Sequence, residues 1–182
     1  ASSFDDSPIE SAAVIFTNEM LFALITPMVY SLFRNLSLDR RTSLVGTILV
    51  ITCSTYLFWS ASAKDHLLVA FLLTCIFWTY SSILVRESDL KWFALLTFFG
   101  FICWARPEYG FVLLTGLIIC QVLLSINIQN HKFFINFKKF KTLLIPGILG
   151  IILGLTPFFF NNYVVTGNPF IPPQYLYVTS RG

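Results

Sequence analysis

Long apolar stretches, separated by short polar segments, run through the whole chain. About 20 apolar residues in a helix cross a bilayer, and on this measure the pattern predicts six spans. The predicted spans cover residues 12–33, 43–61, 66–85, 91–105, 109–128 and 142–160. The second is rich in serine and threonine, which can bond to their own helix backbone and therefore do not exclude a span. We expect an all-α, polytopic transmembrane helix bundle that forms one domain over residues 1–182.

Composition supports lipid as the solvent of this bundle. Of the 182 residues 56% are hydrophobic and only 12% are charged, whereas a soluble protein carries about 25% charged residues. The formal net charge of +3 is small and gives no indication of a nucleic-acid partner. The chain begins without Met and without the basic segment of a signal peptide, so we expect a fragment of a longer protein.

The basic residues indicate the orientation in the membrane. Most of them fall in three of the connections between predicted spans, which carry Arg34, Arg40, Arg41, Arg86, Lys91, Lys132, Lys138, Lys139 and Lys141. The positive-inside rule makes this face cytoplasmic. Both termini then lie outside the cell, in an integral, multi-pass protein that we expect in the plasma membrane of a prokaryote. The aromatic and basic residues that alternate over 133–141 predict a segment along the inner leaflet.

The last predicted span carries a run of helix-bending and small residues. Proline bends a helix, and the face made by Gly147, Gly150 and Gly154 should let a neighbouring helix approach closely. The Gly167-Asn168-Pro169 sequence that follows blocks continuation of the helix. We therefore expect residues 161–175 to form a turn-rich external loop, in which Asn162, Tyr163 and Asn168 are candidate site residues.

Three ionisable residues, Lys64, Asp65 and His66, stand between two apolar runs at the start of the third predicted span. Ionisable groups close to hydrocarbon are costly and often mark a functional site or a lipid–water boundary. Lys64 and His66 can contact an anionic head group or phosphate, while Asp65 orients them or holds a divalent metal such as Mg²⁺ or Mn²⁺. The alternative is structural, because an acid at a helix N-terminus is stabilised by the helix dipole.

Two further groups on the predicted external face are candidates. Arg106 in the Arg106-Pro107-Glu108 sequence can bind phosphate through its planar guanidinium, or it can belong to an ordinary interfacial turn. Asp5 and Asp6 can supply a general base, because a carboxylate beside a second one can have a raised pKa; they can also be a solvated acidic terminus. No soluble-enzyme motif is present.

The order of these features resembles the GT-C superfamily of polytopic glycosyltransferases, in particular the branch of protein mannosyltransferases and aminoarabinose transferases. The stretches that carry the resemblance are Ser60 to Leu68, Arg106-Pro107-Glu108, and Asn162 to Phe170 after a span broken by glycine and proline. Each of these motifs is short, and the remainder of the match is the hydropathy pattern, which covers nearly the whole chain.

The resemblance implies an enzyme that transfers a sugar from a polyprenyl-phosphate donor to a protein, lipid or glycan acceptor on the extracytoplasmic face. It implies a carboxylate base in the first external loop and a phosphate leaving group, with Lys64, His66 or Arg106 stabilising the phosphate. Asp5-Asp6 lies closer to the first span than the acidic motif of the family does. The catalytic aspartate is therefore also expected in a segment that precedes this chain.

Other functional classes remain as alternatives at this point. One is a polymerase or ligase that acts on polyprenyl-linked sugars in the assembly of envelope glycans. Others are a multi-pass transporter and a non-catalytic assembly subunit. A transporter would be expected to place polar residues near the middle of the membrane and to show repeats between its halves. Here the polar residues gather at the predicted external ends of the spans.

Overall fold

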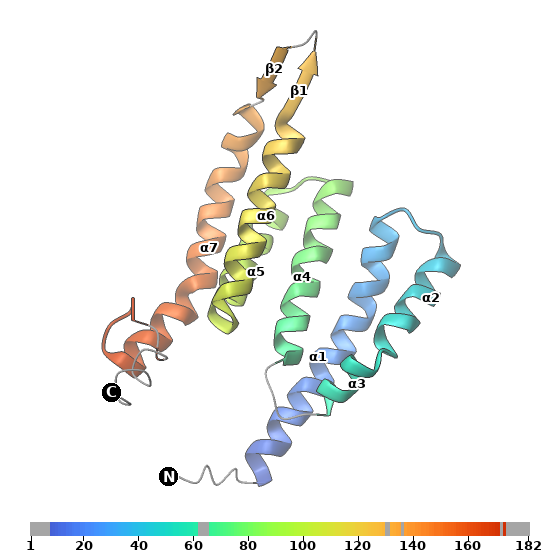
Figure 1. Cartoon of the computed structure of the whole chain (residues 1–182), viewed down its shortest axis with the longest axis vertical. Coiled ribbons are helices and arrows are strands. Elements are labelled where there is room, and N and C mark those ends of the chain that lie inside the picture. Colours follow the sequence, from blue (N-terminus) through green and yellow to red (C-terminus); the bar gives the residue numbers. More distant parts are fainter. Residues whose placement is uncertain (1–7, 62–65, 130–131, 136, 172, 174–182) are drawn as a thin grey trace. The chain divides into compact units, whose positions relative to one another are not determined.

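The computed structural model describes residues 8–61, 66–129, 132–135, 137–171 and 173. Within these ranges the fold is helical, with one short β-hairpin (Figure 1). The elements are α1 (Pro8–Asn35), α2 (Arg40–Ile51), α3 (Ser54–Ser60), α4 (His66–Val85), α5 (Asp89–Ala105), α6 (Pro107–Ser125), β1 (Ile126–Gln129), β2 (Lys132–Ile135) and α7 (Phe137–Thr166). The chain divides into two compact units, residues 1–87 and 88–182.

Among the described residues, three helices are long and apolar enough to cross a membrane. They are Ser11–Asn35 of α1, the whole of α4, and Ile145–Thr166 of α7. Helix α6 contains a shorter apolar stretch, Pro107–Leu123. The helical fold expected from the sequence is thus confirmed, and the length and composition of these helices are compatible with a membrane protein.

The predicted span 43–61 is not one helix. Helix α2 ends at Ile51, and α3 begins only at Ser54. At this break the Thr52 hydroxyl donates to the carbonyl of Ile48 at 2.7 Å, and the Cys53 amide turns back to the carbonyl of Val50 at 3.2 Å. The amide of Cys53 thus bonds to the residue three positions back, where an α-helix bonds to the residue four positions back, and the α-helical pattern ends here. The serine and threonine content of this stretch therefore marks an interruption, in contrast to the single span that we predicted.

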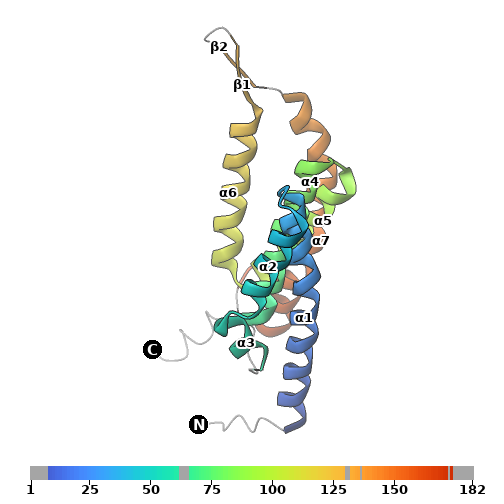
Figure 2. The ribbon, with the colours of Figure 1, turned by 90° about the vertical axis from the view of Figure 1, so that its right-hand side faces the viewer.

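Two other boundaries differ from the prediction. Helix α6 stops at Ser125, and the chain continues into the antiparallel hairpin of β1 and β2, which carries it to α7 (Figure 2). Reading residues 109–128 as one span concealed this hairpin, although Ile126-Asn127-Ile128-Gln129 has the alternation that is typical of a strand. Helix α7 is longer than predicted at both ends.

In the first unit, α1 packs along α4 through both apolar and polar contacts. Ile25 and Val29 form a buried cluster with Leu67. Further along, the indole nitrogen of Trp78 donates to the Ser31 hydroxyl at 2.9 Å. One turn beyond that, the Asn35 side-chain amide donates to the Ser81 hydroxyl at 3.1 Å. Because higher numbers on α1 meet higher numbers on α4, the two helices run parallel, and α2 with α3 provides the return between them.

Helix α2 buries polar residues and exposes apolar ones. Ser43 and Thr47 are 0% and 5% exposed, and their hydroxyls donate to the carbonyls of Asp39 and Ser43 on their own helix. The outward face carries Leu44, Val45, Ile48 and Leu49, all of them exposed. In water this arrangement would be unfavourable, since it removes polar groups from solvent and leaves apolar ones in it. It is favourable where the solvent is hydrocarbon.

In the second unit, α5 and α7 approach so closely that their backbones are in contact. A Cβ atom on Gly154 would overlap the carbonyl oxygen of Thr97 and lie 2.8 Å from the Cα atom of Gly100. A Cβ atom on Gly150 would likewise overlap the carbonyl oxygen of Phe93. The neighbour expected for the glycine face of the last span is therefore α5. Small residues are typical of such interfaces between membrane helices, because they let the backbones approach.

The same contacts show that α5 and α7 are parallel. Phe93 lies against Gly150, and Gly100 lies against Gly154, so the numbers on both helices increase in the same direction. Helix α6 follows α5 after a sharp turn and runs back, as Figure 1 shows. The hairpin is consequently at one end of this unit, and the C-terminal ends of α5 and α7 are at the other.

We predict that replacing Gly154 with alanine destabilises the protein by about 1–3 kcal/mol, because the new methyl group meets backbone atoms that cannot move aside. The matched control is Gly116→Ala on α6, where a Cβ atom would have no neighbour within 4 Å. That change should be neutral or stabilise by up to about 1 kcal/mol through helix propensity. Unfolding of the detergent-solubilised chain, followed by circular dichroism, measures both. Equal effects would contradict the close contact of α5 and α7.

Candidate functional site

The Arg106-Pro107-Glu108 sequence forms the turn between α5 and α6. Arg106 has an extended backbone (φ −151°, ψ 92°), as expected of a residue that precedes proline. Its amide donates to the carbonyl of Ile102 at 2.7 Å and so ends α5. Its own carbonyl accepts from the amides of Tyr109 and Gly110 at 3.1 and 3.2 Å, which starts α6. Pro107 at the first position of α6 needs no amide partner there.

This turn is tight, and it sets the positions of two charged side chains. A Cβ atom on Gly110 would overlap the Cys103 sulfur and lie 3.0 Å from its Cα atom, so α6 starts directly against the end of α5. The Arg106 side chain is half-buried beside this contact. Glu108 is exposed in the first turn of α6, where the helix dipole favours a negative charge. The turn thus fixes a guanidinium and a carboxylate two residues apart at one end of the unit.

The loop after α7 is held by hydrogen bonds from three polar residues. Asn162 is 1% exposed, and its side-chain amide donates to the carbonyl of Pro169 at 3.0 Å. The Thr166 hydroxyl lies 2.7 Å from the carbonyl of Asn162 and accepts from the Asn168 amide at 3.1 Å. The Asn168 side-chain oxygen accepts from the amide of Phe170 at 2.9 Å. These contacts fold residues 167–171 back over the end of the helix.

Glycine and aromatic residues complete the loop. Gly167 has φ +73° and donates to the carbonyl of Tyr163 at 2.9 Å, the conformation that commonly ends an α-helix at glycine. The ring of Phe170 packs edge-on against Phe159, with 5.6 Å between the centroids. Tyr163, the residue that follows the buried Asn162 on α7, is 60% exposed. Of the three loop residues proposed for the site, Tyr163 faces outward, whereas Asn162 and Asn168 hold the loop together.

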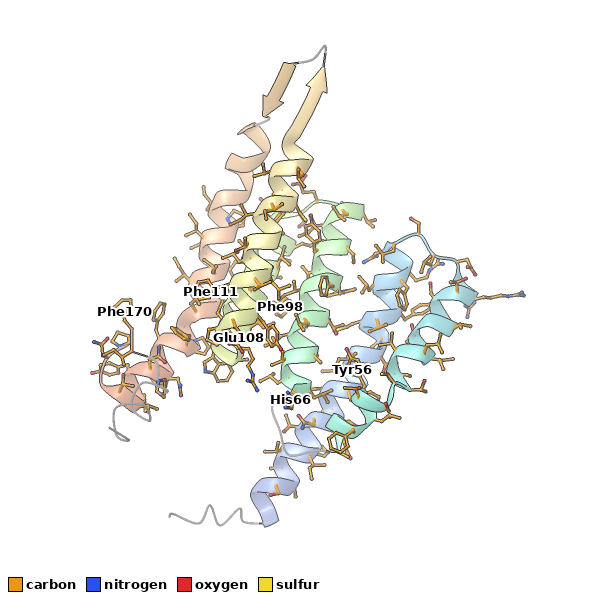
Figure 3. The ribbon with its side chains drawn as sticks, viewed as in Figure 1. Tyr56, His66, Phe98, Glu108, Phe111 and Phe170 are labelled. Carbon is orange, nitrogen blue, oxygen red and sulfur yellow. The ribbon has the colours of Figure 1, made fainter. Side chains whose placement is uncertain are left out.

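The two motifs of the second unit lie at the same end of it. One follows α5 and the other follows α7, and these two helices are parallel and in backbone contact. Figure 3 shows Glu108 at the start of α6 and Phe170 in the loop beyond α7. Lys91 and the hairpin are at the opposite end, as are the first turns of α7 with Lys138 and Lys139. The second unit therefore has its described lysines at one end. At the other end are the Arg-Pro-Glu turn and the segment of residues 162–171, which we call the Asn-rich loop.

Of the candidate site residues in the first unit, His66 is the one that lies within the described part of the chain. It is the first residue of α4 and is exposed (Figure 3). The next residue, Leu67, is 1% exposed and belongs to the cluster with Ile25 and Val29, which fixes the start of the helix. His66 thus stands at the end of this unit opposite to Arg34 and Arg86.

Four predicted site residues lie outside the described part of the chain, namely Asp5, Asp6, Lys64 and Asp65. Their predicted roles as base, phosphate ligand and metal ligand therefore stay predictions. Within the described ranges, no three His, Cys, Asp or Glu side chains are grouped so that they could hold a metal ion.

Sequence reasoning missed Thr166 as the residue that organises the C-terminal loop. Its hydroxyl is within 3.1 Å of the carbonyls of Asn162, Asn168 and Ile171. The signal was present in the spacing, because Asn162 and Thr166 are four residues apart and so lie on one face of a helix. It was overlooked because residues 161–166 were expected to be loop, whereas they form the last turns of α7.

We predict that Asn162→Ala loosens this loop, because the carbonyl of Pro169 loses its partner. The amides of Gly167, Asn168 and Phe170 should then exchange with deuterium about tenfold faster, which corresponds to the roughly 1–2 kcal/mol of a buried hydrogen bond. The control is Asn161→Ala on the exposed side of the helix, which should leave these rates unchanged. Unchanged exchange in Asn162→Ala would show that the side chain does not hold the loop.

Comparisons of this chain with protein-family models, with curated protein sequences and with solved structures gave no match. The resemblance to GT-C glycosyltransferases therefore rests on the motifs of the sequence.

Proposed function

We propose that this chain is part of a membrane glycosyltransferase that moves a sugar from a polyprenyl-phosphate donor to an acceptor on the extracytoplasmic face. The observation that supports this most is the pairing of two motifs within the second unit. The Arg-Pro-Glu turn and the Asn-rich loop are more than 50 residues apart in the sequence, yet they follow parallel helices to the same end. This end is opposite to the described lysines of the unit, as an extracytoplasmic site requires under the positive-inside rule.

The proposed reaction is a displacement at the anomeric carbon of the donor sugar. A hydroxyl oxygen of the acceptor forms a bond to this carbon while the bond from the carbon to the phosphate oxygen breaks. The hydroxyl proton passes to a carboxylate, for which Asp5 and Asp6 are the candidates. The electron pair of the broken bond leaves with the polyprenyl phosphate, whose charge Arg106 stabilises.

Arg106 suits this role for two physical reasons. A guanidinium can donate two parallel hydrogen bonds to phosphate oxygens, and its positive charge attracts them. Its half-buried position beside the α5–α6 contact restricts its motion, so less conformational freedom is lost when it binds. Glu108, exposed next to it, is placed to accept from sugar hydroxyls at the same end of the unit.

The topology that goes with this function has six crossings, in a multi-pass plasma-membrane protein with both termini outside the cell. The parallel pairs α1/α4 and α5/α7 support it, because each pair then enters from one side with a returning segment between its members. In this arrangement α2 and α3 together make the second crossing, and α5, with 17 residues, makes the fourth.

Arg106→Ala in the full-length protein should lower sugar transfer from a polyprenyl-phosphate donor by about 100-fold, because the leaving phosphate loses its guanidinium partner. Arg106→Lys should recover part of the rate, since it restores the charge without the two-point geometry. The control is Arg86→Ala, at the basic end of the first unit. The measurement is transfer of radiolabelled sugar in isolated membranes, with protein levels matched. A normal rate for Arg106→Ala would overturn the role of Arg106.

Cysteine accessibility tests the orientation. In a variant without the native cysteines, His66→Cys should react with a membrane-impermeant maleimide added to intact cells. Arg41→Cys, at the basic end of the first unit, should react only after the cells are opened. Reaction of both from the outside, or of neither, would contradict the proposed topology, whichever way the transfer assay turns out.

A further inference from the structure

We propose that the corner between α1 and α2 binds anionic phospholipid head groups, and we call it the α1–α2 corner. It consists of residues 34–41, which form the end of α1, the turn and the start of α2. The partner is a phospholipid of the leaflet that this end of the first unit faces, with a net negative charge such as that of phosphatidylglycerol. The inference concerns the first unit alone and does not depend on sugar transfer.

The turn itself is fixed by its backbone. The Leu38 amide donates to the carbonyl of Phe33 at 3.2 Å, and the Ser37 amide donates to that of Arg34 at 3.1 Å. This is the paired hydrogen bonding that ends many helices, and it requires a residue with positive φ. Here that residue is Ser37, with φ 64°, although glycine is the usual choice. The two hydrogen bonds therefore hold the turn in one conformation, whereas a flexible loop would not keep Ser37 at a positive φ.

A side chain reinforces the turn. The Nη1 atom of Arg34 donates to the carbonyl of Leu38 at 2.8 Å, so the guanidinium is tied to the far side of the turn. A guanidinium has five N–H groups, and this contact leaves others for an oxyanion. Arg34 is exposed, so a phosphate can approach it from solvent. The result is a cation with a fixed position.

The charges of the corner are strongly unbalanced. Arg34, Arg40 and Arg41 are all exposed, and Asp39 is the one acid among residues 34–41. The Asp39 carboxylate caps α2: it accepts from the Thr42 hydroxyl and from the amides of Thr42 and Arg41. These hydrogen bonds, the Thr42 hydroxyl first, lower the pKa of Asp39. The oxygens of Asp39 thus accept hydrogen bonds from the start of α2. The positive charge of three guanidinium groups predominates at the corner and can attract an anion.

Apolar side chains surround the arginines, which favours a lipid over a soluble anion. Leu36 and Leu38 are 55% and 37% exposed in the turn, and Leu44 and Val45 are exposed on the first turns of α2. Leucines that insert among acyl chains, with arginines at the level of the phosphates, are typical of interfacial segments. A free phosphate would use the arginines but would gain nothing from the leucines. The combination therefore fits a charged lipid.

The experiment titrates the detergent-solubilised full chain with phosphatidylglycerol or phosphatidylcholine and counts bound lipids by native mass spectrometry. The wild-type chain should bind phosphatidylglycerol more tightly. Each basic residue near an anionic lipid surface contributes about 1 kcal/mol, or roughly a fivefold change in affinity. Arg40→Gln/Arg41→Gln should therefore weaken phosphatidylglycerol binding about 25-fold and leave phosphatidylcholine binding unchanged. This pair leaves the Arg34–Leu38 hydrogen bond intact.

Two controls separate charge from folding. Arg40→Lys/Arg41→Lys keeps both charges and should bind phosphatidylglycerol within about threefold of the wild-type chain, since the attraction to a lipid surface is mainly electrostatic. High salt should weaken phosphatidylglycerol binding to the wild-type chain more than to the glutamine variant. The proposal is overturned if the wild-type chain shows no preference for the anionic lipid, or if the glutamine variant shows the same preference as the wild-type chain.

Discussion

The second unit depends on the direct backbone contact between α5 and α7. In a bilayer, lipid chains are as apolar as leucine, so two helices gain little from burying leucine against each other. The helices are instead stabilised by close packing of their backbones, which is possible only where glycine leaves no side chain at the contact. Gly100, Gly150 and Gly154 supply that absence at matching positions on the two helices. This contact fixes the parallel direction of the helices and thereby brings the ends that follow them together.

The first unit is held by a different kind of contact. Its parallel pair, α1 and α4, carries interhelical hydrogen bonds from Trp78 to Ser31 and from Asn35 to Ser81. Such bonds hold membrane helices together with moderate strength, about 0.6 kcal/mol on average. Because they require matched partners on both helices, they also fix the register. Helix α2 follows the same principle, since the buried hydroxyls of Ser43 and Thr47 have hydrogen-bond partners and its exposed apolar side chains suit a surrounding of lipid.

Hydropathy predicted the long apolar helices well because a membrane span is a property of local composition. Its errors fell where single residues decide the outcome. The break at Thr52 and Cys53 depends on backbone hydrogen bonds that no average over a window detects. The last turns of α7 were missed because Asn161 and Asn162 are polar, and their helical state depends on the contacts of Asn162 and Thr166 with the loop. The Arg106 turn was located correctly, because proline restricts the residue before it regardless of context.

The sequence by itself determined the helical, membrane-compatible class of this protein and the turn at Arg106, since each follows from local composition or local sterics. Only the tertiary structure decided which helix meets the glycine face of α7, and that Asn162 holds the loop with its side chain buried. It also placed the turn after α5 and the loop after α7 at one end. These depend on contacts between residues far apart in the chain, and hydropathy does not specify such pairings.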